Sequence, residues 1–200
     1  MPESPNERRV WLSADELERF LGVARDHSTK HYIAMGLMGL CGLRRAEALS
    51  VTPAHVVDTD VQTMIRLEAG DTKADYYRST PVPQTLETSL RTYVEFNDRL
   101  DGWHDEQPFI DVSGRTIARW AKKHAATCND ETSDSDDGWA YFTPHDLRRA
   151  WANRMIEDDV APPLIMNFGG WESWPQFRDA YLNGYSSKRV REELKPLDWM

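Results

Sequence analysis

The sequence contains few cysteines, few lysines and no long apolar run. Cys41 and Cys128 are the only cysteines, too few for a disulfide framework, which favours a reducing compartment such as the cytoplasm. The longest apolar stretch, residues 32–43, is shorter than a bilayer span and predicts a buried helix. No signal-like segment opens the chain. These absences argue against disulfide-rich secreted proteins and predict a cytoplasmic protein with no membrane partner.

A positive charge balance is also missing. The 33 acidic side chains outnumber the 24 Lys and Arg, and the net charge of −9 argues against a generic nucleic-acid coat protein. Most of the cations are arginine, and Asp outnumbers Glu. That composition resembles haloarchaeal cytosolic proteins, whose short hydrated carboxylates keep the surface soluble in molar salt. We therefore expect a halophilic source.

What is present predicts one folded domain over residues 1–200, with its core in 11–185. Forty per cent of the residues are hydrophobic, with eight Trp and six Phe, which argues against disorder. The acidic stretch 129–138 has no apolar residue and predicts a mobile surface loop. Two strands are expected within 57–83, joined by a turn at 69–75. Apolar periodicity predicts helices at 11–26, 31–41, 43–51, 84–100, 113–124, 144–157, 174–183 and 187–194. The fold class is therefore mainly α with a small antiparallel β-sheet (α+β).

Local signals predict several helix boundaries. Ser13 and Glu16 have the spacing of a capping box. Thr143 is expected to cap a helix that has Pro144 as its first residue. The sequence FGGW at 168–171 predicts a tight turn. The side chains expected to face inward include Leu17, Phe20, Leu21 and Ala24 in the first helix, and Leu43, Ala46 and Leu49 in the third.

Four separated segments require a common explanation: GLRRAE (42–47), DTKAD (71–75), HDLRR (145–149) and GGWESWPQFRDAYLNGY (169–185). Each one alone has an ordinary structural interpretation, such as a solvated arginine, a turn lysine, a structural histidine or a core tyrosine. The third, however, gathers cationic side chains at the expected start of a helix, where the helix dipole favours anions. This arrangement predicts either an external anion at that place or side chains that point into solvent.

Taken together, these segments resemble the catalytic domain of the tyrosine recombinases, the phage-type integrase and Xer-like family of site-specific DNA recombinases. The family pattern is an Arg after Gly-Leu, a Lys in a β-hairpin, His-x-x-Arg at a helix start, a Gly-His or Gly-Trp turn, and a Tyr about ten residues later. The resemblance runs from about residue 11 to 195. Tyr185 is an alternative to Tyr181 for the last position. The matching residues are Arg44, followed by Glu47, then Lys73, His145, Arg148, Trp171 and Tyr181.

The resemblance implies that the protein cleaves and rejoins DNA through a 3′-phosphotyrosyl intermediate, with no cofactor and no metal. Arg44 and Arg148 would each present a fork of N–H donors to the phosphate and stabilise its pentavalent transition state. Tyr181 would be the nucleophile. The remaining implied roles are proton acceptor for His145, proton donor to the departing 5′-oxygen for Lys73, and phosphate contact for Trp171.

Other polar residues have simpler expected roles. Arg45, Arg78 and Arg149 are candidates for contacts with the DNA backbone, although Arg149 has structural pairing with an acid as an equal alternative. Glu47 is expected to support Arg44 or its helix. His55, His104 and His124 lack the spacing of metal ligands, so no metal site is assigned.

The resemblance also implies partners: double-stranded DNA, and further copies of the chain in a tetramer on two DNA sites, with a monomer in the free state left open. Residues 186–200 are the expected docking segment between protomers. The separate N-terminal core-binding domain of most members is expected to be absent from these 200 residues, which are either a fragment of a longer recombinase or a minimal type. Two alternatives remain: a catalytically inactive DNA-binding regulator of the same fold, and a type IB topoisomerase-like DNA-relaxing enzyme.

Overall fold

The computed structural model describes residue 10 and residues 12–68, 77–97, 105–131 and 137–181. Lys73, the turn expected at 69–75, Tyr185 and the expected docking segment 186–200 lie outside these described residues.

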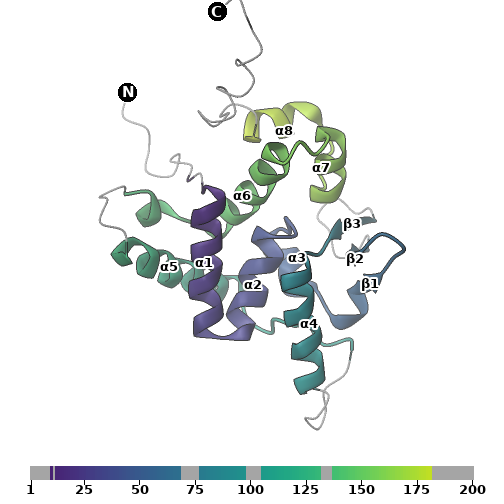
Figure 1. Ribbon diagram of the computed structural model, residues 1–200, viewed down its shortest axis with the longest axis horizontal. Helices are drawn as coiled ribbons and strands as arrows, with labels where there is room; N and C mark the ends of the chain where they lie inside the picture. The colour runs from purple at the N-terminus through teal and green to yellow at the C-terminus, as the bar shows by residue number, and fades with distance from the viewer. Residues whose placement is uncertain (1–9, 11, 69–76, 98–104, 132–136, 182–200) are drawn as a thin grey trace, which may run out of the picture.

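A bundle of helices surrounds one central apolar helix, α2 (Figure 1). Every residue of α2 from His31 to Gly39 is buried, as the apolar stretch predicted. The capping box confirms the predicted start of α1: the Ser13 N–H donates to Glu16 at 2.8 Å, and the Glu16 N–H donates to the Ser13 hydroxyl at 3.2 Å. The helices that pack on α2 (Thr29–Gly39) are α1 (Ala14–His27), α3 (Arg45–Ser50), α4 (Gln84–Asn97), α5 (Gly114–Glu131) and α6 (Pro144–Glu157).

A small antiparallel sheet of order β1-β2-β3 lies beside the bundle (Figure 1). It follows a short 3₁₀ turn, η1 (Pro53–His55), and consists of β1 (Val56–Asp58), β2 (Thr63–Leu67) and β3 (Arg78–Pro81). Ile65 pairs with Thr80, and Leu67 pairs with Arg78. All four of these paired side chains are buried, so one face of the sheet carries an arginine into the interior.

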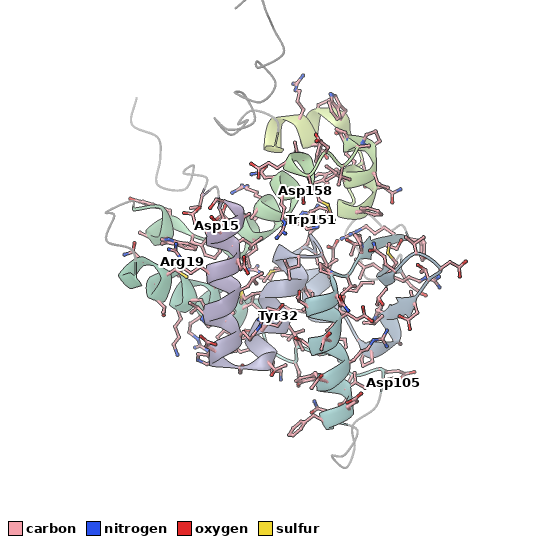
Figure 2. The ribbon with its side chains drawn as sticks, in the orientation of Figure 1. Asp15, Arg19, Tyr32, Asp105, Trp151 and Asp158 are labelled. Atoms are coloured by element: carbon pink, nitrogen blue, oxygen red, sulfur yellow. The ribbon has the colours of Figure 1, made fainter. Side chains whose placement is uncertain are left out.

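The C-terminal helices form a second, smaller core. Helices α7 (Pro162–Gly169) and α8 (Trp174–Tyr181) pack on α6, and Ile165 and Phe177 are fully buried there. Trp151, on α6, belongs to this core and stacks on Trp171 with ring centroids 6.1 Å apart (Figure 2). The second core therefore connects α6 with the two helices that follow it.

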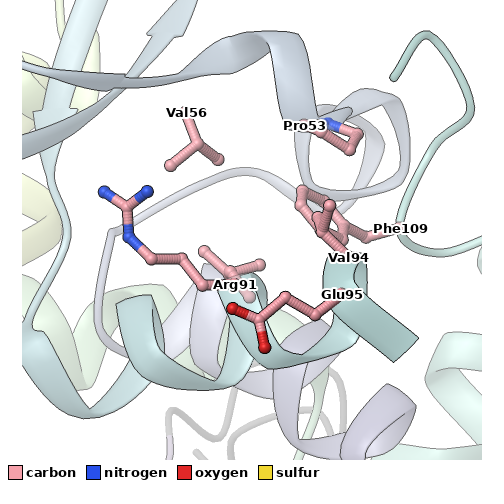
Figure 3. A pocket seen from close by; sticks show the side chains of 7 residues that line it. Pro53, Val56, Arg91, Val94, Glu95 and Phe109 are labelled. Carbon is pink, nitrogen blue, oxygen red and sulfur yellow. The ribbon is translucent and has the colours of Figure 1, made fainter. Parts of the chain in front are cut away.

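An open pocket of about 260 Å³ lies between η1, β1 and α4 (Figure 3). Its lining is mostly apolar and includes Val56, Val94 and Phe109. Arg91 stands at its side but is bound to Glu87 and Asp58. The pocket is thus a surface hollow of the sheet–α4 junction, on the side of the molecule away from α7 and α8 (Figure 1).

The structure confirms the mainly α fold with a small antiparallel sheet and corrects several details. Strand β1 and helix α7 were not expected. The helix expected at 113–124 extends to Glu131, and a 3₁₀ segment, η3 (Asp137–Tyr141), follows, so the expected loop at 129–138 starts too early. The extension is stabilised by burial of Ala125 and Cys128. In α3, Ala46 was expected to face inward but is exposed, and Glu47 is buried.

None of the helices in the described ranges has both the length and the apolar character that a bilayer crossing requires.

Three histidines meet where α1, α2 and α5 pack together. His31 Nδ1 lies 2.9 Å from His124 Nε2, a hydrogen bond in which only one ring carries the proton. The His27 ring stacks on His31 at 4.0 Å, and Lys123 Nζ lies 3.0 Å from His27 Nε2. Desolvation is the largest cause that lowers the pKa of His31 and that of His124 to about 4. His27 and Lys123 lower the pKa of His31 further, and His31, His27 and Lys123 lower that of His124. Both rings are therefore neutral at pH 7.

We expect this histidine pair to make the fold sensitive to acid. Well above pH 6.5, the ordinary histidine pKa, neither state takes up a proton, so the stabilisation is complete. As the pH falls from 6.5 towards 4, the unfolded chain binds protons that the folded chain excludes, and the free energy of unfolding falls by roughly 2–4 kcal/mol. Urea unfolding measured between pH 7 and pH 4.5 checks this. In His124→Gln the slope with pH should be clearly smaller; an unchanged slope would contradict the prediction.

Candidate active site

Arg44 is held from two sides at the start of α3. It occupies the N-cap position, and its backbone N–H donates to Glu47 Oε2 at 2.6 Å. Its guanidinium donates through Nη1 to Glu47 Oε1 at 2.8 Å and through Nη2 to the Gly170 carbonyl at 2.9 Å. The side chain remains 32% exposed. Arg44 is therefore fixed in direction but still open to solvent.

Arg148 lies in the interior, one turn into α6. Its guanidinium donates through Nη1 to the Gly42 carbonyl and through Nη2 to the Gly169 carbonyl at 2.6 Å. Its Cζ stands 4.1 Å from the centre of the Trp171 ring, a cation–π contact. The residue is only 2% exposed, so these contacts offset a large cost of burying charge.

Arg78 does not match its expected role. We predicted a DNA-backbone contact, but the side chain is 1% exposed and points from β3 into the interior. There it donates through Nη2 to Glu47 Oε2 at 2.5 Å and through Nη1 to the Phe168 carbonyl. That prediction is wrong, because a strand places alternate side chains inward and Arg78 shares the inward face with Thr80.

These three arginines converge on the carbonyl row, by which we mean the successive carbonyl oxygens of Phe168, Gly169 and Gly170. Arg78 binds the first, Arg148 the second and Arg44 the third. The end of a helix leaves its last carbonyls without intrahelical partners and carries the negative end of the dipole, so cations are favoured there. The end of α7 therefore brings together arginines from β3, α6 and α3.

Glycine is required at this helix end. Gly170 has φ +71°, a left-handed conformation that ends α7. A Cβ on Gly169 would lie 1.9 Å from the Trp171 ring. The two glycines thus let the chain turn tightly enough to place Trp171 over Arg148. The tight turn predicted at 168–171 is confirmed.

His145 and Arg149 occupy the first turns of α6. Desolvation by surrounding protein atoms, then Arg149, Arg148 and Arg44, lower the pKa of His145 to about 4, against an opposing effect of Asp146, although one side of the residue stays exposed. Arg149 donates to Asp146 at 2.5 Å, so of its two expected roles the structure shows pairing with an acid. Asp146 also accepts from the backbone and hydroxyl of Thr143 at 2.8 and 2.7 Å, fixing the start of α6.

Tyr181 is the last residue of α8, one helical turn after Phe177. The Phe177 ring meets Trp171 edge-on, with centroids 5.2 Å apart, and α8 packs against α6. The described side chains of the predicted site that come together are Arg44, His145, Arg148 and Trp171.

Sequence reasoning missed a basic face on α5. Arg115, Arg119 and Lys122 are exposed, and their spacing of four and three residues puts them on one side of the helix. Arg45 is also exposed, and its Nε would lie 3.1 Å from a Cβ placed on Gly114 at the start of α5. The signal was available as a periodic pattern of cations in an otherwise acidic chain.

Within the described residues, no group of three or more His, Cys, Asp and Glu side chains has the arrangement of a metal site. The histidine cluster of α1, α2 and α5 is held by ring contacts and by the His31–His124 hydrogen bond.

Several solved structures of recombinases and integrases share the fold of this chain. The XerA recombinase superposes with a TM-score of 0.76 at 18% identity, over 97% of this chain and 67% of that one. The XerH recombinase bound to its difH substrate gives 0.68 at 14% identity, over 96% of this chain and 56% of that one. The catalytic domain of bacteriophage HP1 integrase gives 0.60 at 12% identity, over 96% of this chain and 98% of that domain. At these identities the likeness concerns the fold.

Sequence comparison adds the family. Two proteins of Sinorhizobium fredii, described as the integrase/recombinases y4eF and y4qK, are each 31% identical to this chain over 160 and 163 residues. Each match covers 78% of this chain, and 57% and 47% of the two relatives, so the chain spans about half of their length. The model of the phage integrase family matches residues 10–186. This chain therefore belongs to the phage integrase family, the tyrosine recombinases.

Proposed function

We propose that this protein is a site-specific DNA recombinase that cleaves and rejoins DNA through a 3′-phosphotyrosyl intermediate. The observation that carries the proposal is the convergence of Arg44 and Arg148 on the adjacent carbonyls of Gly170 and Gly169. Consecutive residues are about 3.8 Å apart, so two guanidinium forks lie side by side. The recombinase names of the relatives and the difH-bound XerH complexes support the same assignment.

The charge of the site favours an anion. Arg44, Arg78 and Arg148 supply three positive charges, and Glu47 supplies one negative charge, which leaves an excess of two positive charges among these four side chains. Paired N–H forks match the non-bridging oxygens of a phosphodiester. A scissile phosphate of DNA would supply the external anion that the sequence at 145–149 predicts.

The proposed reaction assigns one step to each of the remaining site residues. The Tyr181 oxygen attacks phosphorus and forms the tyrosyl ester while the bond to the 5′-oxygen breaks. His145, neutral at pH 7 because its pKa is low, accepts the phenolic proton, and the arriving phosphate favours the protonated ring. Lys73 donates a proton to the departing 5′-oxygen. Rejoining reverses these steps, so the phosphoester bond is exchanged and no ATP is consumed. The proposed steps involve no metal.

The basic face of α5, extended by Arg45, is the surface that we assign to the DNA backbone next to the site. It reconciles DNA binding with the net charge of −9, because the cations are concentrated where the duplex would lie.

Assembly of four copies on two DNA sites, with residues 186–200 as the docking segment, is part of the same proposal.

A trapped-adduct experiment tests the function. The protein is incubated with nicked duplexes covering the DNA that flanks its gene, and covalent adducts are separated in detergent gels. We expect an adduct that disappears in Tyr181→Phe and persists in Tyr185→Phe, because a phenylalanine cannot form the ester. Loss only in Tyr185→Phe would move the nucleophile to residue 185.

The same assay separates the two alternatives. Tight DNA binding without any adduct would identify a catalytically inactive regulator. An adduct accompanied by relaxation of supercoiled plasmid, with no exchange between two sites, would identify a type IB topoisomerase-like enzyme. Exchange between two sites is the result that the proposed function requires.

A further inference from the structure

We infer that Arg78 is a positioning residue, which holds the end of α7 and Glu47 in place while Arg44 and Arg148 bind the phosphate. The inference rests on the proposed function and adds to it a residue that does not touch the substrate. Arg78 bridges two acceptors that belong to different parts of the site, the Glu47 carboxylate and the Phe168 carbonyl.

The carboxylate of Glu47 is the first half of this bridge. It is 2% exposed and accepts from the Arg44 backbone, the Arg44 guanidinium and the Arg78 guanidinium. One carboxylate oxygen, Oε2, is shared between the Arg44 backbone and Arg78. Loss of Arg78 would therefore leave Glu47, and with it the direction of Arg44, held from one side only.

The carbonyl row is the second half. When a phosphate enters, its oxygens compete with the Gly169 and Gly170 carbonyls for the donors of Arg148 and Arg44. The Arg78 side chain is only 1% exposed, so its hydrogen bond to the Phe168 carbonyl does not take part in that competition. It is the charged contact that keeps the end of α7 attached as the other two guanidiniums turn towards the substrate.

The strand that carries Arg78 is a firm support for this role. Arg78 pairs with Leu67 in the sheet, and two residues later the Thr80 hydroxyl donates to the Cys41 carbonyl at 2.7 Å. Cys41 immediately precedes Gly42, whose carbonyl binds Arg148, and lies three residues before Arg44. β3 is thus joined to the segment 41–44, which presents Arg44 and supplies the carbonyl that Arg148 binds.

The test compares Arg78→Met and Arg78→Lys with the unaltered chain. Three quantities are measured: the single-turnover rate of adduct formation at saturating nicked DNA, the dissociation constant for that DNA, and hydrogen exchange of the 168–171 amides. We expect Arg78→Met to lower the rate 10–100-fold, as for other residues that orient a direct ligand, with less than a threefold change in affinity and faster exchange at 168–171. Arg78→Lys should recover part of the rate. Arg91→Met is the control. Arg91 lies on α4 and forms exposed ion pairs with Asp58 and Glu87, so its replacement should leave all three quantities unchanged.

Two results overturn the inference: a normal rate in Arg78→Met, or losses of rate and DNA affinity that match each other. A coupling measurement covers the case in which Arg78→Met does not fold. Arg78→Lys and Glu47→Gln should then lower the rate together by much less than the product of their separate effects, and full multiplicativity would refute the bridge. If the unaltered chain forms no adduct, the proposed function is refuted. The hydrogen-exchange comparison between Arg78→Met and the unaltered chain still tests the bridge.

Discussion

Arg148→Met is expected to reduce the rate of adduct formation by at least about 10³-fold. The variant keeps an unbranched apolar stem under Trp171 but loses the donors that would neutralise the transition-state phosphate, and removal of a single such donor already costs about 10²–10³-fold. Arg148→Lys should fall between, since it keeps the charge but loses the planar fork. The measurement is a single-turnover time course with saturating nicked DNA.

Stability has to be measured beside this rate, because the guanidinium also binds the Gly42 and Gly169 carbonyls. Leaving a buried carbonyl unpaired costs roughly 1–3 kcal/mol, so thermal unfolding should show a lower midpoint, and the kinetic assay is run well below it. Arg154→Met is the matched control on the same helix, where Arg154 is exposed and 3.8 Å from Asp158. A rate for Arg148→Met within tenfold of the unaltered chain would exclude Arg148 from the reaction.

Gly42→Ala is expected to destabilise the fold by roughly 2–5 kcal/mol. Gly42 has φ +66°, a conformation that costs an L-residue about 1–2 kcal/mol, and the new Cβ would lie 2.3 Å from the Trp151 ring, an overpacking that costs about 1–3 kcal/mol more. Relief of the clash would displace the Gly42 carbonyl from Arg148. Urea unfolding followed by circular dichroism gives the difference in free energy.

Gly22→Ala provides the comparison. Gly22 lies within α1, and a Cβ there would have no neighbouring atom within 4 Å. Alanine is the better helix former, so this variant should be more stable than the unaltered chain by roughly 0.5–1 kcal/mol. If Gly42→Ala unfolded at the same urea concentration as the unaltered chain, the close approach of residue 42 to α6 would be refuted.

Periodicity and capping signals were sufficient to locate the long helices, although α5 extends beyond its predicted end. The Ser13 box, the buried stripe of α1 and the start of α6 at Pro144 all lie where the sequence predicted them. Each depends on residues within a few positions of one another, which a linear pattern records well. The same holds for the glycine turn after Phe168, because a left-handed helix end selects glycine.

The features that were missed depend on contacts between distant segments. Arg78 has the sequence of an exposed strand residue, and only the approach of Glu47 and Phe168 makes its burial favourable. Glu47 was assigned a supporting role, but its burial was not predicted, since a carboxylate is rarely buried without a partner. The α7 helix is short and begins with two prolines, so its pattern is weak until Ile165 finds the second core.

Such patterns do not reveal that the protein acts on DNA. That prediction came from the family resemblance. The sequence placed Arg44, His145, Arg148 and Trp171 in one site, and the structure brings their described side chains together. The catalytic roles assigned to all six site residues stay predictions, as do the halophilic source, the cytoplasmic location and the tetramer; these residues are Arg44, Lys73, His145, Arg148, Trp171 and Tyr181.

The bonding of the arginines to backbone carbonyls has a consequence for ionic strength. The backbone carbonyls belong to the same chain as the arginines, so they stay beside the guanidiniums at any salt concentration. Buried charged contacts are also screened far less than exposed ones. Dissolved salt ions therefore compete poorly with Phe168, Gly169 and Gly170 for these guanidiniums. Concentrated electrolyte would slow the first encounter with a duplex while leaving the spacing of the arginine forks intact.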